Sequence, residues 1–285
     1  GRLEGYIMIG VTGVTGKLGG QVAKVLSQKG LKAVHIARSP ERAIKYDNAE
    51  IRKASYENSE ESRKALEGIK TLLMVSAKEN PKRVEEHHDF IDAAKIAGVE
   101  HIVYISFYNN KKDATFTLSR DHYQTEKYIK EQGLKYTFLR DNFYIDFFLD
   151  LCFEYGEIRG PAGDGLVSAV ARRDAADIVV AVMLNVQEYE NKVLNLTGPR
   201  DLSMKDIVEV VGEKLGKEIF YINESVEEAY ESRKVWEAEQ WQYDSWVSTY
   251  TAIAKGEQSG VSLDIEKILN RPATSLEDLV KEYVK

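Results

Sequence analysis

Short β-rich runs alternate with segments of helical period along the first part of this chain, and this alternation limits the possible folds more than any other feature. Strands are expected at Tyr6–Thr12, Ala33–Ala37 and Thr71–Ser76, with helices at Leu18–Lys29 and near Ser59–Glu67 between them. Strands separated by helices are typical of βαβ units, which assemble into a parallel sheet covered by helices. The chain should therefore begin with such a sheet.

The same rhythm continues beyond residue 80 and predicts an α/β fold of the Rossmann type, with a doubly wound parallel sheet. The further elements expected are the helix Val84–Ala97, the strand His101–Phe107, the helix Arg120–Gln132, the strand Lys135–Leu139, the helix Asp174–Met183 and the strand Lys192–Leu196.

After about residue 150 the pattern changes. Residues 156–165 contain four glycines and one proline, which indicates a loop or a short hairpin. From Asp201 onward the chain is mostly of helical character, and all three tryptophans fall between Trp236 and Trp246. We expect residues 1–155 with roughly 174–197 to form the Rossmann domain, and residues 156–173 with 198–285 to form a smaller, mostly helical lobe that caps the strand ends, where ligands of open α/β sheets bind.

Composition excludes several classes of protein. The chain has 285 residues and a formal net charge of -7, so no basic face favours a nucleic-acid partner. No apolar run reaches the roughly 18 to 20 residues of a membrane helix, and residues 1–5 belong to no periodic pattern and carry no signal-peptide signature. The single cysteine, Cys152, should fill the core. The adjacent His87 and His88 diverge on a helix, so no metal site is expected. We expect a soluble, cytoplasmic protein that does not bind membranes.

Three glycines stand between the first strand and the first helix. Gly13, Gly16 and Gly19 occupy spacings that let backbone N–H groups and the positive helix end face a pyrophosphate. A simple turn would need only one glycine. The sequence therefore predicts a dinucleotide site, with these residues as contacts in and around the turn: Thr12, Gly13, Thr15, Gly16, Lys17, Leu18 and Gly19.

The end of the second strand indicates which dinucleotide binds. NAD-binding sites usually place an acidic residue there, but this chain has Arg38, followed by Ser39 and Pro40. A guanidinium pairs with a 2′-phosphate, whereas a carboxylate repels it. NADP(H) is therefore the expected cofactor, and a solvated surface arginine is the alternative interpretation of Arg38.

Several motifs together resemble the NmrA-like group of atypical short-chain dehydrogenase/reductases, and most closely its bacterial NADPH-dependent quinone oxidoreductases of the second type. The resemblance covers nearly the whole chain. It rests on the segments 11–19, 37–40, 92–99, 122–127, 136–140, 163–165 and 271–276.

The resemblance implies reduction of quinones by hydride transfer from NADPH, and the group also contains non-catalytic redox sensors. This chain departs from the quinone reductases at two places. Ser55 and Tyr56 replace an Asp-Tyr pair after the third strand, although Tyr56 could still lie near the adenine. The segment Asp141–Tyr144 is more acidic than usual, which could alter the substrate pocket.

Catalytic candidates follow from a Tyr-x-x-x-Lys spacing. Tyr123 and Lys127 would share one helix face, where the lysine charge lowers the tyrosine pKa, and Ser106 at the end of a strand would complete the set. The resembling quinone reductases keep the lysine and usually lack the tyrosine. We therefore expect Lys127 to contact the cofactor ribose and Tyr123 to be either an acid or a solvated residue. Ser76 is a further cofactor candidate.

The aromatic residues that follow the fifth and sixth strands are candidates for an acceptor pocket, which would be lined by Phe107, Asn142, Phe143 and Tyr144. Packing within the second lobe is an equal alternative. The first hypothesis is an NADPH-dependent reductase of a quinone-like small molecule, and the second is a non-catalytic NADP(H) sensor. A sugar-nucleotide epimerase is disfavoured because the second lobe is acidic. The oligomeric state is left open.

Overall fold

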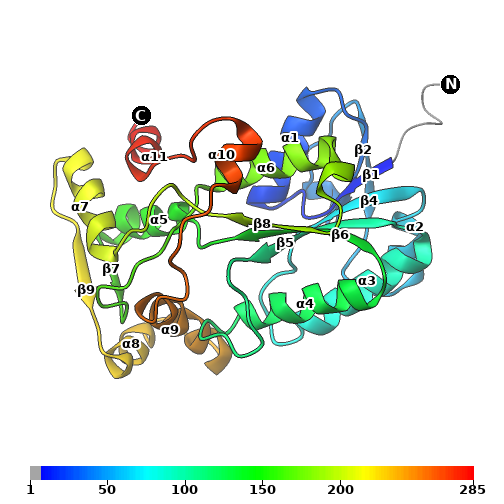
Figure 1. The fold of residues 1–285 in the computed structure, drawn as a ribbon. Coiled ribbons are helices and arrows are strands. Elements are labelled where there is room, and N and C mark those ends of the chain that lie inside the picture. Colours follow the sequence, from blue (N-terminus) through cyan, green and yellow to red (C-terminus); the bar gives the residue numbers. More distant parts are fainter. Residues whose placement is uncertain (1–7) are drawn as a thin grey trace. The chain divides into compact units, whose positions relative to one another are not determined.

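A computed structural model describes residues 8–285, so residues 1–5 and the start of the expected strand at Tyr6 lie outside the described part. Its main feature is a seven-stranded sheet with the order β3-β2-β1-β4-β5-β6-β8 (Figure 1). The strands are β1 (Met8–Val11), β2 (Ala33–Ala37), β3 (Ala49–Lys53), β4 (Ile69–Met74), β5 (His101–Phe107), β6 (Lys135–Asp141) and β8 (Lys192–Leu196).

The order of the strands confirms the doubly wound Rossmann prediction. The chain starts in the middle of the sheet at β1, moves outward to β2 and β3, and returns to continue through β4 on the other side of β1. The β1–β2, β1–β4, β2–β3 and β4–β5 pairs are parallel. Every residue of β2 and β5 is buried, as expected for parallel strands covered on both faces.

Helices cover both faces of this sheet. Figure 1 shows α1 (Lys17–Gln28) and α6 (Arg172–Leu184) on one face, and α3 (Arg83–Ala97) and α4 (Ser119–Glu131) on the other. The second face also carries α2 (Glu60–Ala65), and its core contains Leu66, Phe90, Ile129 and Phe138. Two short 3₁₀ helices, η2 (Pro40–Arg42) and η3 (Val186–Tyr189), follow β2 and α6.

The described chain divides into two compact units. The first contains the described residues up to Ser106 together with 121–140 and 175–194, and the second contains 107–120, 141–174 and 195–285. The domain limits expected from the sequence differ from this division at residues 107–120 and 141–155, which group with the second unit. These two segments follow β5 and β6, so the chain leaves the first unit at the carboxyl ends of those strands.

The second unit is mainly helical, as the sequence predicts. Its buried core is formed by apolar residues such as Phe148, Val211 and Ile253, and it includes Cys152, which confirms the expected core role of this cysteine. No helix within residues 8–285 is long and apolar enough to cross a bilayer. The elements are α5 (Ile145–Tyr155), β7 (Glu157–Gly160), α7 (Met204–Leu215), β9 (Phe220–Asn223), α8 (Val226–Arg233), α9 (Gln240–Ala254), α10 (Asp264–Leu269) and α11 (Leu276–Tyr283).

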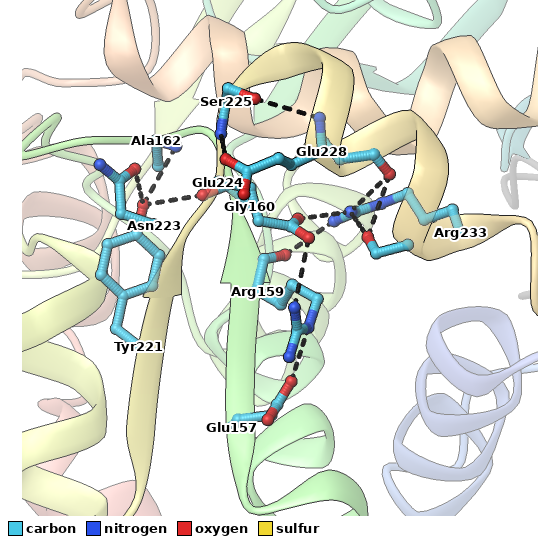
Figure 2. Close-up of polar contacts among 12 residues, drawn as sticks. Glu157, Arg159, Gly160, Ala162, Tyr221, Asn223, Glu224, Ser225, Glu228 and Arg233 are labelled. Atoms are coloured by element: carbon cyan, nitrogen blue, oxygen red, sulfur yellow. Dashed lines mark hydrogen bonds and ion pairs between the residues drawn. The ribbon is translucent and has the colours of Figure 1, made fainter.

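The glycine-rich segment after α5 is not the loop or hairpin that its composition suggests. Its first residues form β7, which pairs in parallel with β9 from much later in the chain. Figure 2 shows the polar contacts that hold this pair to α8: Arg233 donates to Glu224 Oε1 at 2.8 Å and to the carbonyl of Arg159 at 2.7 Å. Long-range pairing therefore overrides the local turn signal.

Candidate functional site

The turn between β1 and α1 is closely packed at two of its three glycines. Gly13 has φ +65°, and a Cβ there would lie 2.2 Å from the Cγ2 atom of Val75. A Cβ on Gly19 would lie 2.2 Å from the carbonyl oxygen of Gly13. These two glycines are therefore required for α1 to pack against the turn, whatever binds there.

Gly16 differs from the other two glycines because it is exposed. A Cβ at this position would meet only the carbonyl oxygen of Gly13, at 3.3 Å. Gly16 is also the N-cap of α1, where no side chain caps the helix and the first turn holds no acidic residue. The N–H groups of this turn therefore suit an approaching anion. Thr15 and Lys17 are exposed beside it, whereas the Leu18 side chain is buried.

Thr12 and Tyr56 support the turn from within. The Thr12 hydroxyl donates to the Leu73 carbonyl at 3.0 Å and accepts from the Val75 N–H at 3.0 Å. The Tyr56 hydroxyl donates to the Val75 carbonyl at 2.5 Å, and its ring stacks on Phe90 with centroids 4.4 Å apart. These side chains join β1, the segment after β3 and the end of β4. The sequence predicts that Thr12 and Tyr56 contact the cofactor, and the contacts they make in this structure are with other protein groups.

Arg38 directly follows the last residue of β2 and is exposed. Among residues 8–285, its guanidinium has no hydrogen-bond or ion-pair partner, so its charge is available to a ligand. Lys53, the last residue of β3, is also exposed and is the register partner of Ala37. Lys53 could not be selected from the sequence, because only the pairing of β2 with β3 places it next to the strand end that carries Arg38.

Ser76 and a buried histidine hold the chain after β4. The Ser76 hydroxyl donates to the Ile105 carbonyl at 3.1 Å, and the Ala77 N–H donates to His87 Nε2 at 2.9 Å. Burial, together with the nearby Arg83 charge, lowers the pKa of His87 well below its usual value. His87 is therefore a neutral packing residue, and its role is to fix the backbone after β4.

The expected set of Ser106, Tyr123 and Lys127 is not joined by hydrogen bonds between its members that the structure records, and its catalytic role stays a prediction. The Ser106 hydroxyl instead donates to Glu126 at 2.5 Å, and Glu126 is paired with Arg140 through bonds of 2.7 and 3.0 Å. Tyr123 is partly exposed and Lys127 is exposed, and neither makes a hydrogen bond or ion pair within residues 8–285. The buried face of α4 thus presents Glu126 to the sheet, and a role of Lys127 at the cofactor stays a prediction.

The substrate candidates lie in the second unit. Phe107 and Phe143 pack edge to face with centroids 5.0 Å apart, and Phe116, which sequence reasoning missed, contacts both. The buried Asn142 amide bonds Gln258 in both directions, through its Nδ2 at 2.9 Å and its Oδ1 at 3.1 Å. Phe107 and Phe116 belong to a buried apolar cluster against which the partly exposed Phe143 packs, whereas Asn142 joins segments of the chain.

A cavity of about 240 Å³ in the same unit is lined by other residues, among them Ile145, Ala169, Arg200 and Thr274. None of these was selected from the sequence. No group of three or more His, Cys, Asp or Glu residues within the described part is arranged to hold a metal ion.

Comparison with known proteins gives consistent matches over the whole chain. The model of the NmrA-like family matches residues 7–276. Quinone oxidoreductase 2 of Escherichia coli strain K12 is 29% identical over 280 residues, which is 96% of this chain and 97% of the relative. Two of the matching solved structures are enzymes. NADPH-dependent quinone oxidoreductase of Escherichia coli in complex with NADPH has TM-score 0.90 and 28% identity, over 98% of this chain and 100% of its own. Triphenylmethane reductase of Citrobacter sp. in complex with NADP(H) has TM-score 0.85 and 31% identity, over 96% and 99%.

Proposed function

This chain belongs to the NmrA-like family, and on that premise we propose that it is an NADPH-dependent oxidoreductase that reduces a quinone or a similar small carbonyl acceptor. The proposal is supported by relatives named as quinone and triphenylmethane reductases that match along nearly their full length. The observation that carries it is the open Gly16 turn with the partner-free Arg38 at the neighbouring strand end.

The residues of the first unit fit NADP(H). The uncapped N-terminus of α1 would hold the pyrophosphate through its N–H groups, with Gly16 allowing close approach and Thr15 and Lys17 beside it. Arg38 would pair with the 2′-phosphate. When bound, NADPH supplies a hydride. Hydrogen bonds of Thr12, Tyr56 and Ser76 to protein groups stabilise the walls of this site, and contact of these residues with the cofactor stays a prediction.

We expect a quinone rather than a ketone as the acceptor, because the relatives with matching length include a quinone reductase. A quinone needs less proton donation than a ketone, because hydride transfer leaves a delocalised hydroquinone anion. The Ser106 hydroxyl donates to Glu126, and a role of Tyr123 as the acid stays a prediction. Phe143 is partly exposed and is backed by the buried rings of Phe107 and Phe116, so Phe143 would be the aromatic contact for a flat ring.

The test is NADPH absorbance with the purified protein, without added flavin, against a panel of quinones, ketones and aldehydes. We expect NADPH to be consumed with quinones, and a Gly16→Val variant to give no turnover. Tight NADPH binding without reduction of any acceptor would contradict the proposed enzymatic activity and favour a role as a non-catalytic redox sensor.

A further inference from the structure

The carboxyl ends of β1, β2 and β3 lie at one edge of the sheet in the first unit, the edge where open α/β sheets bind ligands. The three strands are neighbours and pair in parallel. Strand β1 leads into the Gly16 turn, β2 is followed by Arg38, and β3 ends at Lys53. Gly16 and Arg38 belong to the proposed NADP(H) site, and the role of Lys53 follows from its position beside them.

Lys53 lies level with the end of β2. It is the register partner of Ala37, the last residue of β2, and the N–H of the next residue, Ala54, donates to the Ala37 carbonyl at 3.2 Å. Adjacent strands are about 4.8 Å apart and consecutive Cα atoms about 3.8 Å apart, so the Cα atoms of Lys53 and Arg38 are separated by roughly 6 Å. Both side chains are exposed and long enough to reach one phosphate group between them.

The charge of Lys53 is available at this edge. Within residues 8–285 its ammonium group has no hydrogen-bond or ion-pair partner. The other cation of the strand, Arg52, is occupied, because its guanidinium pairs with Glu50 at 2.6 Å and donates to the carbonyls of Ala65 and Glu67 at 2.9 and 2.8 Å. Glu50, the acidic residue of β3, is thereby neutralised and does not compete for Lys53.

The 2′-phosphate of NADPH requires more positive charge than one arginine supplies. A phosphate monoester carries a charge of about −1.5 to −2 at pH 7, and one guanidinium matches at most one negative charge. An arginine binds two phosphate oxygens in a fixed geometry, whereas a lysine ammonium is a compact point charge with three rotatable donors. Together the two groups can neutralise the dianion. NADH lacks this phosphate and gains nothing from either cation.

We propose that Lys53 is a second specificity-determining residue for NADP(H), which holds the 2′-phosphate together with Arg38. The inference rests on the proposed function, because it extends the cofactor site assigned there. Arg38 orients the phosphate and Lys53 completes its neutralisation, so the preference for NADPH over NADH is divided between β2 and β3. Lys53 takes no part in binding the pyrophosphate or the nicotinamide.

Binding titrations test this role without turnover. The probes are two matched pairs that differ only in the 2′-phosphate: NADPH with NADH, and adenosine 2′,5′-bisphosphate with AMP. Lys53→Ala should weaken binding of NADPH and of the bisphosphate by roughly tenfold, the low side for a hydrogen bond to a charged group, and leave NADH and AMP binding unchanged. Lys53→Arg should keep most of the affinity, and Lys53→Glu should lose more than Lys53→Ala. The matched control is Lys29→Ala, an exposed lysine at the opposite end of α1.

The ³¹P resonance of the 2′-phosphate in the bound bisphosphate gives a second readout. A neighbouring cation favours the dianion, so binding to the wild type should lower the pKa of this phosphate, and Lys53→Ala should raise it again towards that of the free ligand. Lys29→Ala should behave as the wild type.

Two results would overturn the proposal. If Arg38→Ala weakens NADPH binding while Lys53→Ala keeps the affinities and the ³¹P titration of the wild type, Lys53 is a solvated lysine of an edge strand and the proposed function stands. If Lys53→Ala loses NADH and AMP affinity by the same factor as NADPH affinity, the loss does not involve the phosphate. Neither result depends on quinone reduction, so the role of Lys53 and the proposed function can fail separately.

Discussion

Individual glycines of the β1–α1 turn have separate roles, and the difference can be tested. Gly16→Val should abolish binding of NADPH and NADH with little loss of stability, because its Cβ meets only one atom, at 3.3 Å. Gly19→Ala should disturb the fold itself, because its Cβ would lie 2.2 Å from the Gly13 carbonyl oxygen. Cofactor titration combined with urea unfolding distinguishes these outcomes. Unchanged NADPH affinity in a folded Gly16→Val protein would contradict the assignment of the pyrophosphate site to this turn.

Arg38 should determine the preference for NADPH. Loss of a charge-assisted pair costs roughly 1.5 to 3 kcal/mol, so Arg38→Ala should weaken NADPH binding by about that amount and leave NADH binding nearly unchanged. Arg42→Ala, in the neighbouring η2 and also exposed, is the matched control. Calorimetric titration with both cofactors measures the preference. Equal affinity of the wild type for NADPH and NADH would contradict this role.

Asp141, buried at the end of β6, should make stability depend on pH. Its pKa is raised from 3.8 to about 7, so between these values the folded state keeps a proton that the unfolded chain has released. The contribution of this group to stability is therefore fully present below about pH 3.8 and is lost as pH rises through 7. The unfolding free energy of Asp141→Asn minus that of the wild type should therefore increase from pH 5 to pH 8, because only the wild type loses this contribution. A constant difference across this range in urea unfolding would show that Asp141 is not perturbed.

At the scale of elements, the junction of β7, β9 and α8 depends on a buried ion pair. Glu224 and Arg233 have side chains only 3% and 9% exposed, and Glu224 also lies 3.4 Å from Arg159. Glu224→Gln leaves Arg233 buried without its counter-charge, so we expect a loss of about 3 to 5 kcal/mol in unfolding free energy. The exposed Glu231→Gln of the same helix should cost little. A loss below about 1 kcal/mol for Glu224→Gln would contradict the account.

Helices with an apolar stripe along one face, and strands buried on both faces, could be predicted from the sequence. Each of them gives an apolar pattern within its own segment. Strand β3 could not be bounded, since Ala49–Lys53 is polar and at the sheet edge. Strand β7 was hidden by its glycines, because its partner β9 lies about sixty residues further along the chain. A local pattern cannot show a pairing of this range.

At the scale of the whole molecule, the glycine-rich turn between β1 and α1 could be predicted because its residues are contiguous, whereas the contacts around Ser106 could not. The Tyr123–Lys127 spacing predicted one helix face, but the face of α4 that meets Ser106 carries Glu126, whose charge is matched by Arg140 from β6. The burial of Asp141 could not be predicted, because an acidic residue at a strand end gives no local signal of burial. A sequence motif shows which residues share one helix face or one turn. It does not show which side chains from different elements come into contact.

The most direct test of the central claim is single-turnover reduction of a quinone by NADPH deuterated at the transferred position of its nicotinamide ring, under anaerobic conditions and without flavin. Direct hydride transfer predicts one hydroquinone formed per NADPH consumed and a slower reaction with the deuterated cofactor. Bound NADPH that remains unoxidised with every quinone would contradict the claim.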